Sequence, residues 1–272
     1  KDLNQVYFRS GWDAQALSVM TACRTPIQNQ HAHMDPGGFD FSAYGSPLVC
    51  DPGIYTYKDC EERYWMKGIR WHNCLNIDGR DPWEYKGSWE YGPQKEGKIV
   101  NAGETTEMSW TVSEHRNYDP VVCRRGIALV DNQFVLVMDW VYGLEQGQTV
   151  ELNFHTDRMN TTFYENQVVT DDRDVSNLTV AISEGWSAER ILGKVSTGND
   201  IWHDSVIVRF RKTVSQSQCV SAVILMPFPK EQAAKPIHVP EIQWMDKEPV
   251  AIFDWNGKGY KIRMSENQLI CL

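Results

Sequence analysis

The alternation of apolar and polar positions predicts strands and tight turns along almost the whole chain. Two runs rich in β-branched residues, 121–130 and 134–141, flank a short Asp-Asn turn and predict a β-hairpin. A second hairpin is predicted between 250–255 and 260–264, around an Asn-Gly turn. Further strands are predicted at 17–23, 38–44, 72–78, 106–113, 148–155, 177–183, 206–213 and 218–226.

This pattern also predicts the fold class. Several runs alternate in the way expected of antiparallel sheets that expose one face. No helical pattern extends beyond about two turns, so parallel βαβ units are not expected. No repeat is visible, which argues against a propeller or solenoid. We therefore expect an all-β fold, a large multi-sheet antiparallel β-sandwich with few short helices, forming a single domain over residues 1–272 with a loop at 227–240.

Composition narrows the class of ligand. Of the 272 residues, 42% are hydrophobic and 23% are charged, which is not the composition of a disordered chain. The net charge of −9 argues against nucleic acid as a ligand, although a local basic site can still bind an anionic substrate. No apolar run is long enough to predict a membrane span. The 11 Trp, 11 Tyr and 9 Phe residues suit both sheet packing and stacking on sugar rings.

Cysteine spacing and the start of the chain add little about function. The seven cysteines include no C-x-x-C pair, so we expect mostly free, buried thiols and leave one disulfide open. The first five residues lack an initiator Met and the apolar core of a signal peptide, which suggests a mature form or an excised fragment.

The segment that indicates chemistry contains three histidines and an aspartate. In extended backbone, residues two apart project to the same face, so His31 and His33 are expected to point the same way. Asp51 precedes a Pro-Gly turn, and His72 begins a predicted strand. Two or three histidines with one aspartate suit a zinc site of mixed nitrogen and oxygen ligands.

Spacing alone leaves alternatives open. The two histidines of an H-x-H sequence are often an ordinary surface or core pair. Cys74 shares a predicted strand face with His72 and can replace it as a ligand. Cys50 is expected to face away from Asp51, toward the core.

The same segment resembles the C-terminal β-domain of the heparinase II/III-like polysaccharide lyases. Residues 31–39 are similar to the family pattern H-x-H-x-D-x-G-x-F. Asp51-Pro52-Gly53 and His72-Asn73 resemble two further family motifs, an aspartate before a glycine-containing turn and a His-Asn pair opening a strand. Residues 8–13 resemble the family's arginine-containing first strand, and 123–139 its hairpin ending in an aspartate.

The resemblance implies a lyase that cleaves uronic-acid-containing polysaccharide, such as heparin, heparan sulfate or alginate, by β-elimination. It implies that His31 is catalytic and that His33, Asp51 and His72 bind a structural zinc ion. It also implies an N-terminal α/α toroid that this chain lacks, so the isolated chain is expected to be inactive. By the same resemblance, the protein is expected in the periplasm or outside a bacterial cell.

Other histidines and arginines receive simpler interpretations. We expect His115 to be solvated in a charged turn, while His155, at the end of a predicted strand, can reach the cleft. His203 and His238 are expected on the surface. The pair Arg124-Arg125 can touch an anionic chain, although alternate strand residues usually divide between the sandwich interior and solvent.

Two competing hypotheses assign the chain a function without catalysis. The first is a non-catalytic carbohydrate-binding β-sandwich that uses exposed aromatic residues such as Trp65, Trp71, Trp83 and Trp89. The second is a structural or partner-binding β-domain with no ligand. Neither needs histidines that converge, so the position of His31, His33, Asp51 and His72 in space distinguishes them from a lyase.

Overall fold

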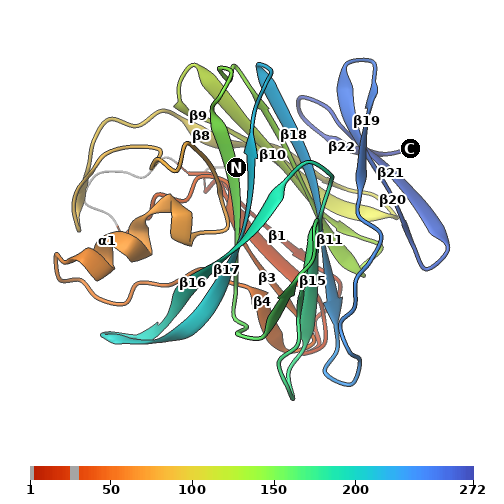
Figure 1. Cartoon of the computed structure of the whole chain (residues 1–272), viewed down its shortest axis with the longest axis horizontal. Coiled ribbons are helices and arrows are strands. Elements are labelled where there is room, and N and C mark those ends of the chain that lie inside the picture. The colour runs from red at the N-terminus through yellow and green to blue at the C-terminus, as the bar shows by residue number, and fades with distance from the viewer. Residues whose placement is uncertain (1–2, 25–30) are drawn as a thin grey trace.

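A computed structural model of the chain describes residues 3–24 and 31–272 (Figure 1). Within these ranges the chain forms 22 strands, one α-helix and one short 3-10 helix. Every strand pair is antiparallel, and the strands group into five sheets. The expected all-β antiparallel sandwich with few short helices is confirmed.

The central sheet has eight strands and is built around the first predicted hairpin. The two hairpin strands pair in register from Val122 opposite Tyr142 to Val130 opposite Phe134. In spatial order the strands are β13 (Thr161–Phe163), β14 (Gln167–Thr170), β15 (Asn177–Ile182), β18 (Gln218–Phe228), β11 (Phe134–Tyr142), β10 (Val121–Val130), β9 (Met108–Tyr118) and β8 (Gly97–Glu104).

Both faces of this central sheet are covered, which explains why all ten residues of β10 are buried. Ile127 and Leu129 belong to one apolar cluster, while Ala128 and Val130 belong to another. Successive residues of a strand face opposite sides of a sheet, so each strand supplies two cores. The molecule is therefore a sandwich of three layers rather than two.

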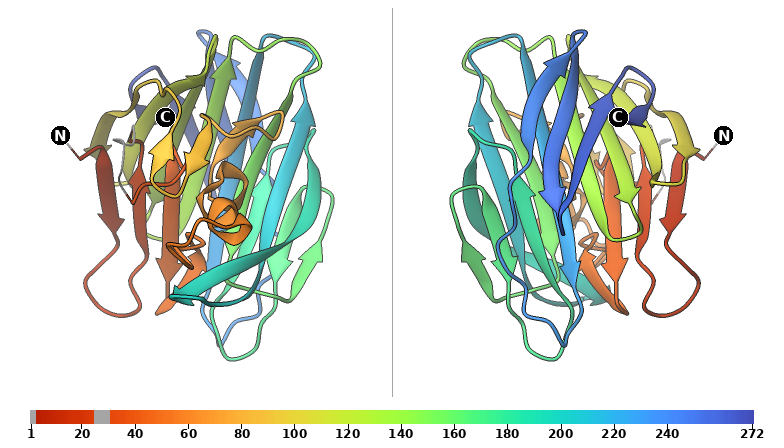
Figure 2. Two further views of the ribbon diagram at one scale, coloured as in Figure 1. Left: turned by 90° about the vertical axis from the view of Figure 1, so that its left-hand side faces the viewer. Right: turned by 90° about the vertical axis from the view of Figure 1, so that its right-hand side faces the viewer.

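Two four-stranded sheets pack on the face that contains Ile127 and Leu129. Their strands are β1 (Gln5–Arg9), β2 (Ser18–Ala22), β3 (Gly38–Ala43) and β4 (Ser46–Val49) in one sheet, and β16 (Ser187–Gly198), β17 (Ile201–Thr213), β12 (Thr149–Thr156) and β5 (Leu75–Ile77) in the other. Helix α1 (Glu61–Lys67) and the 3-10 helix η1 (Ile69–Trp71) lie on this side of the molecule (Figure 2).

A four-stranded C-terminal sheet covers the opposite face, seen in blue in Figure 2. It contains the second predicted hairpin, which pairs from Val250 opposite Arg263 to Trp255 opposite Lys258. Its strands are β19 (Glu241–Met245), β20 (Glu248–Trp255), β21 (Lys258–Met264) and β22 (Leu269–Cys271), and a small separate sheet pairs β6 (Tyr85–Gly87) with β7 (Glu90–Tyr91).

The remaining sequence expectations mostly agree with the structure. Each predicted strand overlaps an observed one, although 72–78 shortens to β5 and the run beginning at 106 extends to Tyr118. The expected loop at 227–240 begins only at 229, because β18 continues through Phe228. All seven cysteines are free thiols. Among the described helices, none has the length and apolar character needed to cross a membrane.

Candidate functional site

Three residues predicted as metal ligands meet although they are far apart in sequence. His33 lies in the loop before β3, Asp51 follows β4, and His72 follows η1. One nitrogen or oxygen atom of each lies within 4.8 Å of those of the other two. The three residues predicted as ligands therefore form one group that is able to hold a metal ion.

The ring nitrogens support this interpretation. His33 Nε2 and His72 Nε2 are both buried and have no hydrogen-bond partner among the described residues. The two ring centroids lie 5.1 Å apart. Buried polar atoms normally have a partner, so two orphaned imidazole nitrogens side by side fit a metal ion that they would share.

The imidazoles of His33 and His72 differ in the direction of their pKa shifts. Burial and the neighbouring His72 lower the pKa of His33 to about 3, so His33 is neutral and ready to ligate. Burial also disfavours a charge on His72, but the carboxylate of Asp51 outweighs it and raises the pKa of His72 to about 9. His72 Nδ1 donates to Asp51 Oδ2 at 2.8 Å, and the net effect of His72 is to lower the pKa of Asp51 against its own burial.

The carboxylate is positioned by the backbone. The amide of Asp51 donates to Asp40 Oδ1 at 2.7 Å, and the amide of Gly53 donates to Asp51 Oδ1 at 2.8 Å. The Asp51 side chain is 41% exposed whereas that of His72 is 1% exposed. The group thus opens to solvent on the side of Asp51.

A buried arginine joins this site to the central sheet. Arg125 of β10 forms a two-point ion pair with Asp139 of β11, with nitrogen–oxygen distances of 2.7 and 3.1 Å. Its Nη1 also donates to the carbonyl oxygens of Gly37, at 3.1 Å, and Asn73, at 2.7 Å. Arg125 is therefore not free to touch an anionic chain, because its guanidinium is buried and holds the two histidine segments together.

The side chain of Asn73 shows why an asparagine follows His72 at this point of the chain. Its side-chain nitrogen donates to the carbonyls of Phe39, at 2.8 Å, and Cys50, at 3.0 Å. Its side-chain oxygen accepts from the amide of His155 at 2.6 Å. One buried amide therefore links β3, the end of β4 and β12, the elements that surround the group.

His31 differs from His33 in its surroundings. Residues 31–37 form a loop rather than the expected extended strand, and His31 is exposed while His33 is buried. The ring of His31 packs edge-on against Tyr57 and Trp89, at centroid distances of 5.4 and 5.2 Å. Tyr57 and Trp89 stack on each other at 5.6 Å and are themselves exposed. The histidine predicted to be catalytic is thus accessible beside an aromatic platform.

A buried lysine fixes the loop between the two histidines, and sequence reasoning missed it. Lys67 Nζ donates to the carbonyl oxygen of Ala32 at 3.0 Å and to the hydroxyl of Tyr91 at 2.9 Å. The Tyr91 hydroxyl in turn donates to the same carbonyl oxygen at 2.5 Å. Burial, and then the charge of Arg63, lowers the pKa of Lys67 to about 8. No local pattern marks a lysine at the end of a short helix as buried.

The cysteine alternative is not what the geometry favours. His72, not Cys74, completes the metal-capable group. Cys74 is fully buried, and burial raises the pKa of its thiol well above the ordinary value. Cys50 is half-buried, with Sγ 3.6 Å from the carbonyl oxygen of His155.

One histidine expectation is wrong, and one possibility that the sequence left open is not realised. His115 lies inside β9 and is buried, because that strand continues through the residues expected to form a turn. His155 is fully buried, with Nε2 2.5 Å from Ser205 Oγ and Nδ1 2.9 Å from the carbonyl oxygen of Trp71, so it does not reach solvent. His203 and His238 are exposed, as expected.

Two further expectations need correction. Trp83 is buried against Tyr91 rather than exposed, whereas Trp65 and Trp71 are half-buried. Arg124 is 6% exposed and forms an ion pair with Glu114 at 2.7 Å, so it too is occupied within the fold.

Together, the fold and the site define a class of protein: a layered antiparallel β-sandwich with a metal-capable His-Asp-His group and an exposed histidine two residues before the first member of that group. The family model described as "Heparinase II/III-like, C-terminal" matches residues 7–244. The chain belongs to this family.

Curated relatives and solved structures agree with that assignment. A heparin-sulfate lyase of Pedobacter heparinus is 26% identical over 182 residues, which cover 64% of this chain and 26% of the relative. One from Bacteroides thetaiotaomicron is 29% identical over 159 residues, covering 54% of this chain and 21% of the relative. The structure of heparan sulfate lyase from Pedobacter heparinus superposes with a TM-score of 0.75 and 20% identity, covering 99% of this chain and 41% of that one.

A heparinase III structure superposes with a TM-score of 0.80 at 19% identity, covering 97% of this chain and 41% of that one. These structural likenesses show the fold. The chain spans about a quarter of the length of the curated relatives and about two fifths of that of the solved structures.

Proposed function

We propose that this chain forms the β-domain of a polysaccharide lyase that cleaves a uronic-acid polymer of the heparan sulfate type. The observation that carries the proposal is His31, an exposed imidazole whose loop is held by Lys67 directly beside a buried metal-capable group. Family membership and relatives named as heparin-sulfate lyases support the substrate class.

The chemistry of elimination explains what such a histidine does. The proton alpha to a uronate carboxylate is weakly acidic, and neutralising the carboxylate lowers the cost of the enolate-like intermediate. A base then removes the proton and an acid protonates the leaving oxygen. An imidazole donates or accepts a proton near neutral pH, so we assign His31 to the carboxylate or to the proton transfer.

We further propose that His33, Asp51 and His72 hold a structural zinc ion. Two imidazole nitrogens and one carboxylate oxygen suit zinc better than calcium or magnesium, which prefer oxygen ligands. The orphaned Nε2 atoms of both histidines support the fit. When bound, the ion supplies a crosslink between the His33 loop and the segments that follow β4 and η1. Holding His33 orients the adjacent His31.

The remaining catalytic groups are proposed to come from a helical toroid domain. Among the described residues, the exposed face beside His31 contributes Tyr57 and Trp89. Because groups that act as a unit lose most of the rate when one is removed, this chain alone is not expected to turn over substrate.

Substitution of His31 tests the proposal in the enzyme that contains this domain with its toroid. His31→Ala should lower turnover by roughly 10²–10⁴-fold, the range for one positioned acid–base group. Turnover is read as ultraviolet absorbance of the unsaturated uronate product. The matched control is His203→Ala, which removes an exposed histidine on β17 that pairs with Asp157. Equal turnover of the His31 and His203 variants would remove His31 from the reaction.

A carbohydrate-binding module without catalysis is the second candidate, favoured by the exposed stack of Tyr57 and Trp89. In that case Trp89→Ala weakens polysaccharide binding, whereas His31→Ala leaves the enzyme's turnover unchanged. The two variants therefore separate the two functions.

A further inference from the structure

A separate pocket of about 350 Å³ lies beside α1 and η1. Its lining includes Trp65, Arg70 and Trp71 from the helical segment, and Ile207 and Arg209 from β17. None of these residues belongs to the His-Asp-His group or contacts His31. The pocket combines an aromatic wall with guanidinium groups, a lining suited to a small polar ligand with an apolar face.

The aromatic wall is ordered and apolar. The rings of Trp65 and Trp71 are parallel to within 2°, with centroids 5.9 Å apart, and both are half-buried. Ile191 and Ile207 add aliphatic surface to the lining. Flat indole rings backed by aliphatic side chains suit the apolar face of a pyranose ring.

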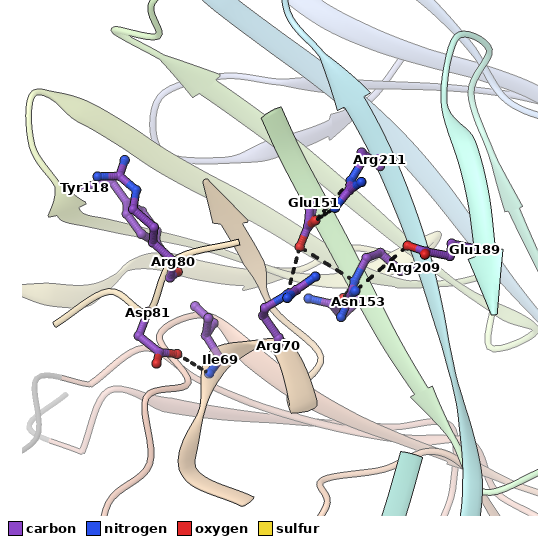
Figure 3. A network of polar contacts seen from close by, with 10 residues as sticks. All are labelled: Ile69, Arg70, Arg80, Asp81, Tyr118, Glu151, Asn153, Glu189, Arg209 and Arg211. Carbon is purple, nitrogen blue, oxygen red and sulfur yellow. Dashed lines mark hydrogen bonds and ion pairs between the residues drawn. The ribbon is translucent and has the colours of Figure 1, made fainter. Parts of the chain in front are cut away.

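The cationic part of the pocket is a cluster of three arginines, which lie at different distances from the carboxylate of Glu151 (Figure 3). Glu151 is 1% exposed and accepts from Arg211 at 2.5 and 3.1 Å and from Arg70 at 3.2 Å. Arg209 comes no closer to Glu151 than 3.6 Å, which is beyond hydrogen-bond distance. Three guanidinium groups thus surround a single buried carboxylate.

Arg209 has side-chain hydrogen-bond donors that are available to a ligand. Its side chain is 6% exposed, and its Nε donates to Asn153 Oδ1 at 2.8 Å. Its Nη1 lies 3.9 Å from Glu189, a carboxylate that is itself 50% exposed, which is too far for a hydrogen bond. Within the described part of the chain, the terminal nitrogens of this nearly buried arginine therefore have no close acceptor.

The acidic residue of the lining is already engaged. Asp81 accepts from the amide of Ile69 at 2.9 Å through one oxygen and from the hydroxyl of Tyr64 at 2.7 Å through the other (Figure 3 shows the contact with Ile69). Its hydrogen bonds thus shape the start of η1 and the edge of the pocket, and each oxygen of this carboxylate already accepts a hydrogen bond.

We propose that this pocket binds one carboxylate-bearing sugar residue of the polymer. The pyranose ring packs on Trp65 and Trp71, and its carboxylate receives hydrogen bonds from Arg209 and Arg70. This proposal rests on the proposed function for the substrate class. Trp71 directly precedes His72, and Lys67 of α1 holds Ala32, so one helical segment supports both this pocket and the site of His31.

Titration of tryptophan fluorescence in the 272-residue chain tests the pocket. The probe is a heparan sulfate tetrasaccharide, compared with maltotetraose, a neutral oligosaccharide of equal length. We expect saturable binding of the acidic probe that weakens with added salt, and no saturation with the neutral one. Equal binding of the two probes, or binding of neither, would overturn the proposal.

Substitutions in the lining test whether the tetrasaccharide binds in this pocket. Trp65→Ala and Arg70→Gln should each weaken binding of the acidic tetrasaccharide by about tenfold or more. Glu151 keeps Arg211 in the Arg70 variant, and circular dichroism checks that both variants fold. Trp12→Ala, which removes a tryptophan that is 90% exposed and lies outside the pocket lining, is the matched aromatic control and should bind within about twofold of the parent chain. Parent-like affinity of both pocket variants contradicts the proposal.

Failure of this inference is distinguishable from failure of the proposed lyase function. Loss of turnover in the His31 variant, with parent-like sugar binding by the pocket variants, removes the pocket and keeps the lyase. Binding that depends on Trp65 and Arg70, together with unchanged turnover in the His31 variant, keeps the pocket and removes the assigned role of His31.

Discussion

Neighbouring histidines in this chain have opposite environments, and side-chain burial determines their roles. His31 is exposed and packs edge-on against two aromatic rings, whereas His33 is buried with a nitrogen that lacks a partner among the described residues. Burial penalises the charged form of an imidazole, so His33 remains neutral at ordinary pH. The chain thereby separates an accessible imidazole from a buried, metal-capable one within three residues.

Burial of His115 predicts a pH dependence of stability unrelated to the site. Burial, followed by the charge of Arg125, lowers its pKa to about 3. Between pH 6.5 and 3 the unfolded chain binds a proton that the folded chain does not, so stability falls as the pH falls through this window. The slope is about 1.4 kcal/mol per pH unit for one such group.

The variant His115→Phe should show a shallower loss of stability in that window, measured by urea unfolding between pH 6.5 and 3.5. His203→Ala removes an exposed histidine and should keep the parent slope. A parent-like slope for His115→Phe would mean that this histidine is protonated in the folded chain.

Strand identity was largely predictable because it depends on local pattern. The β10–β11 hairpin carries β-branched residues on both faces around a short turn, and both sequence and structure place it there. The expected turn near His115 was wrong because pairing with β10 extends β9 to Tyr118, and cross-strand pairing is invisible to a local pattern. The strand β5 is shorter than predicted because His72 and Asn73 bond to the residues that follow β4 and to β12 rather than joining a ladder.

Arg125 joins elements, and its removal should destabilise the whole sandwich. Arg125→Ala leaves the carboxylate of Asp139, 3% exposed, without its partner and frees the carbonyls of Gly37 and Asn73. We expect a loss of about 3–5 kcal/mol in the free energy of unfolding, the usual cost of an unpaired buried charge. Urea unfolding at pH 7 measures it.

The matched control is Arg116→Ala on β9, whose side chain is 56% exposed and pairs with Glu114 at 3.3 Å. A surface ion pair is worth about 1 kcal/mol or less. Similar losses for Arg125→Ala and Arg116→Ala would show that the buried ion pair does not hold the layers together.

At the scale of the whole molecule, the sheets bring the site residues together from segments that the sequence separates. His33, Asp51 and His72 belong to three connections on one side of the central sheet. Their candidacy was visible from the sequence through residue type and family resemblance. The residues that support the site were not visible from the sequence. Lys67, Tyr91 and the stack of Tyr57 and Trp89 acquire their roles only through tertiary contacts.

The fold also decides which arginines remain available. Arg124 and Arg125 were candidates for anion contact, yet both pair with carboxylates inside the protein. Arg209 carried no sequence signal and lines a pocket with unused donors. Composition argues against ligand classes such as nucleic acid, but it does not locate the basic groups that a structure leaves free for an anion.

Elemental analysis of the chain, purified without chelator, tests the central claim most directly. The account predicts about one zinc ion per chain, lost in His33→Ala together with a lower melting temperature, because a bound ion adds its binding free energy to the folded state. His31→Ala, two residues away, should keep the zinc and the melting temperature. A parent chain that contains no transition metal, or equal loss of zinc in both variants, would contradict the account.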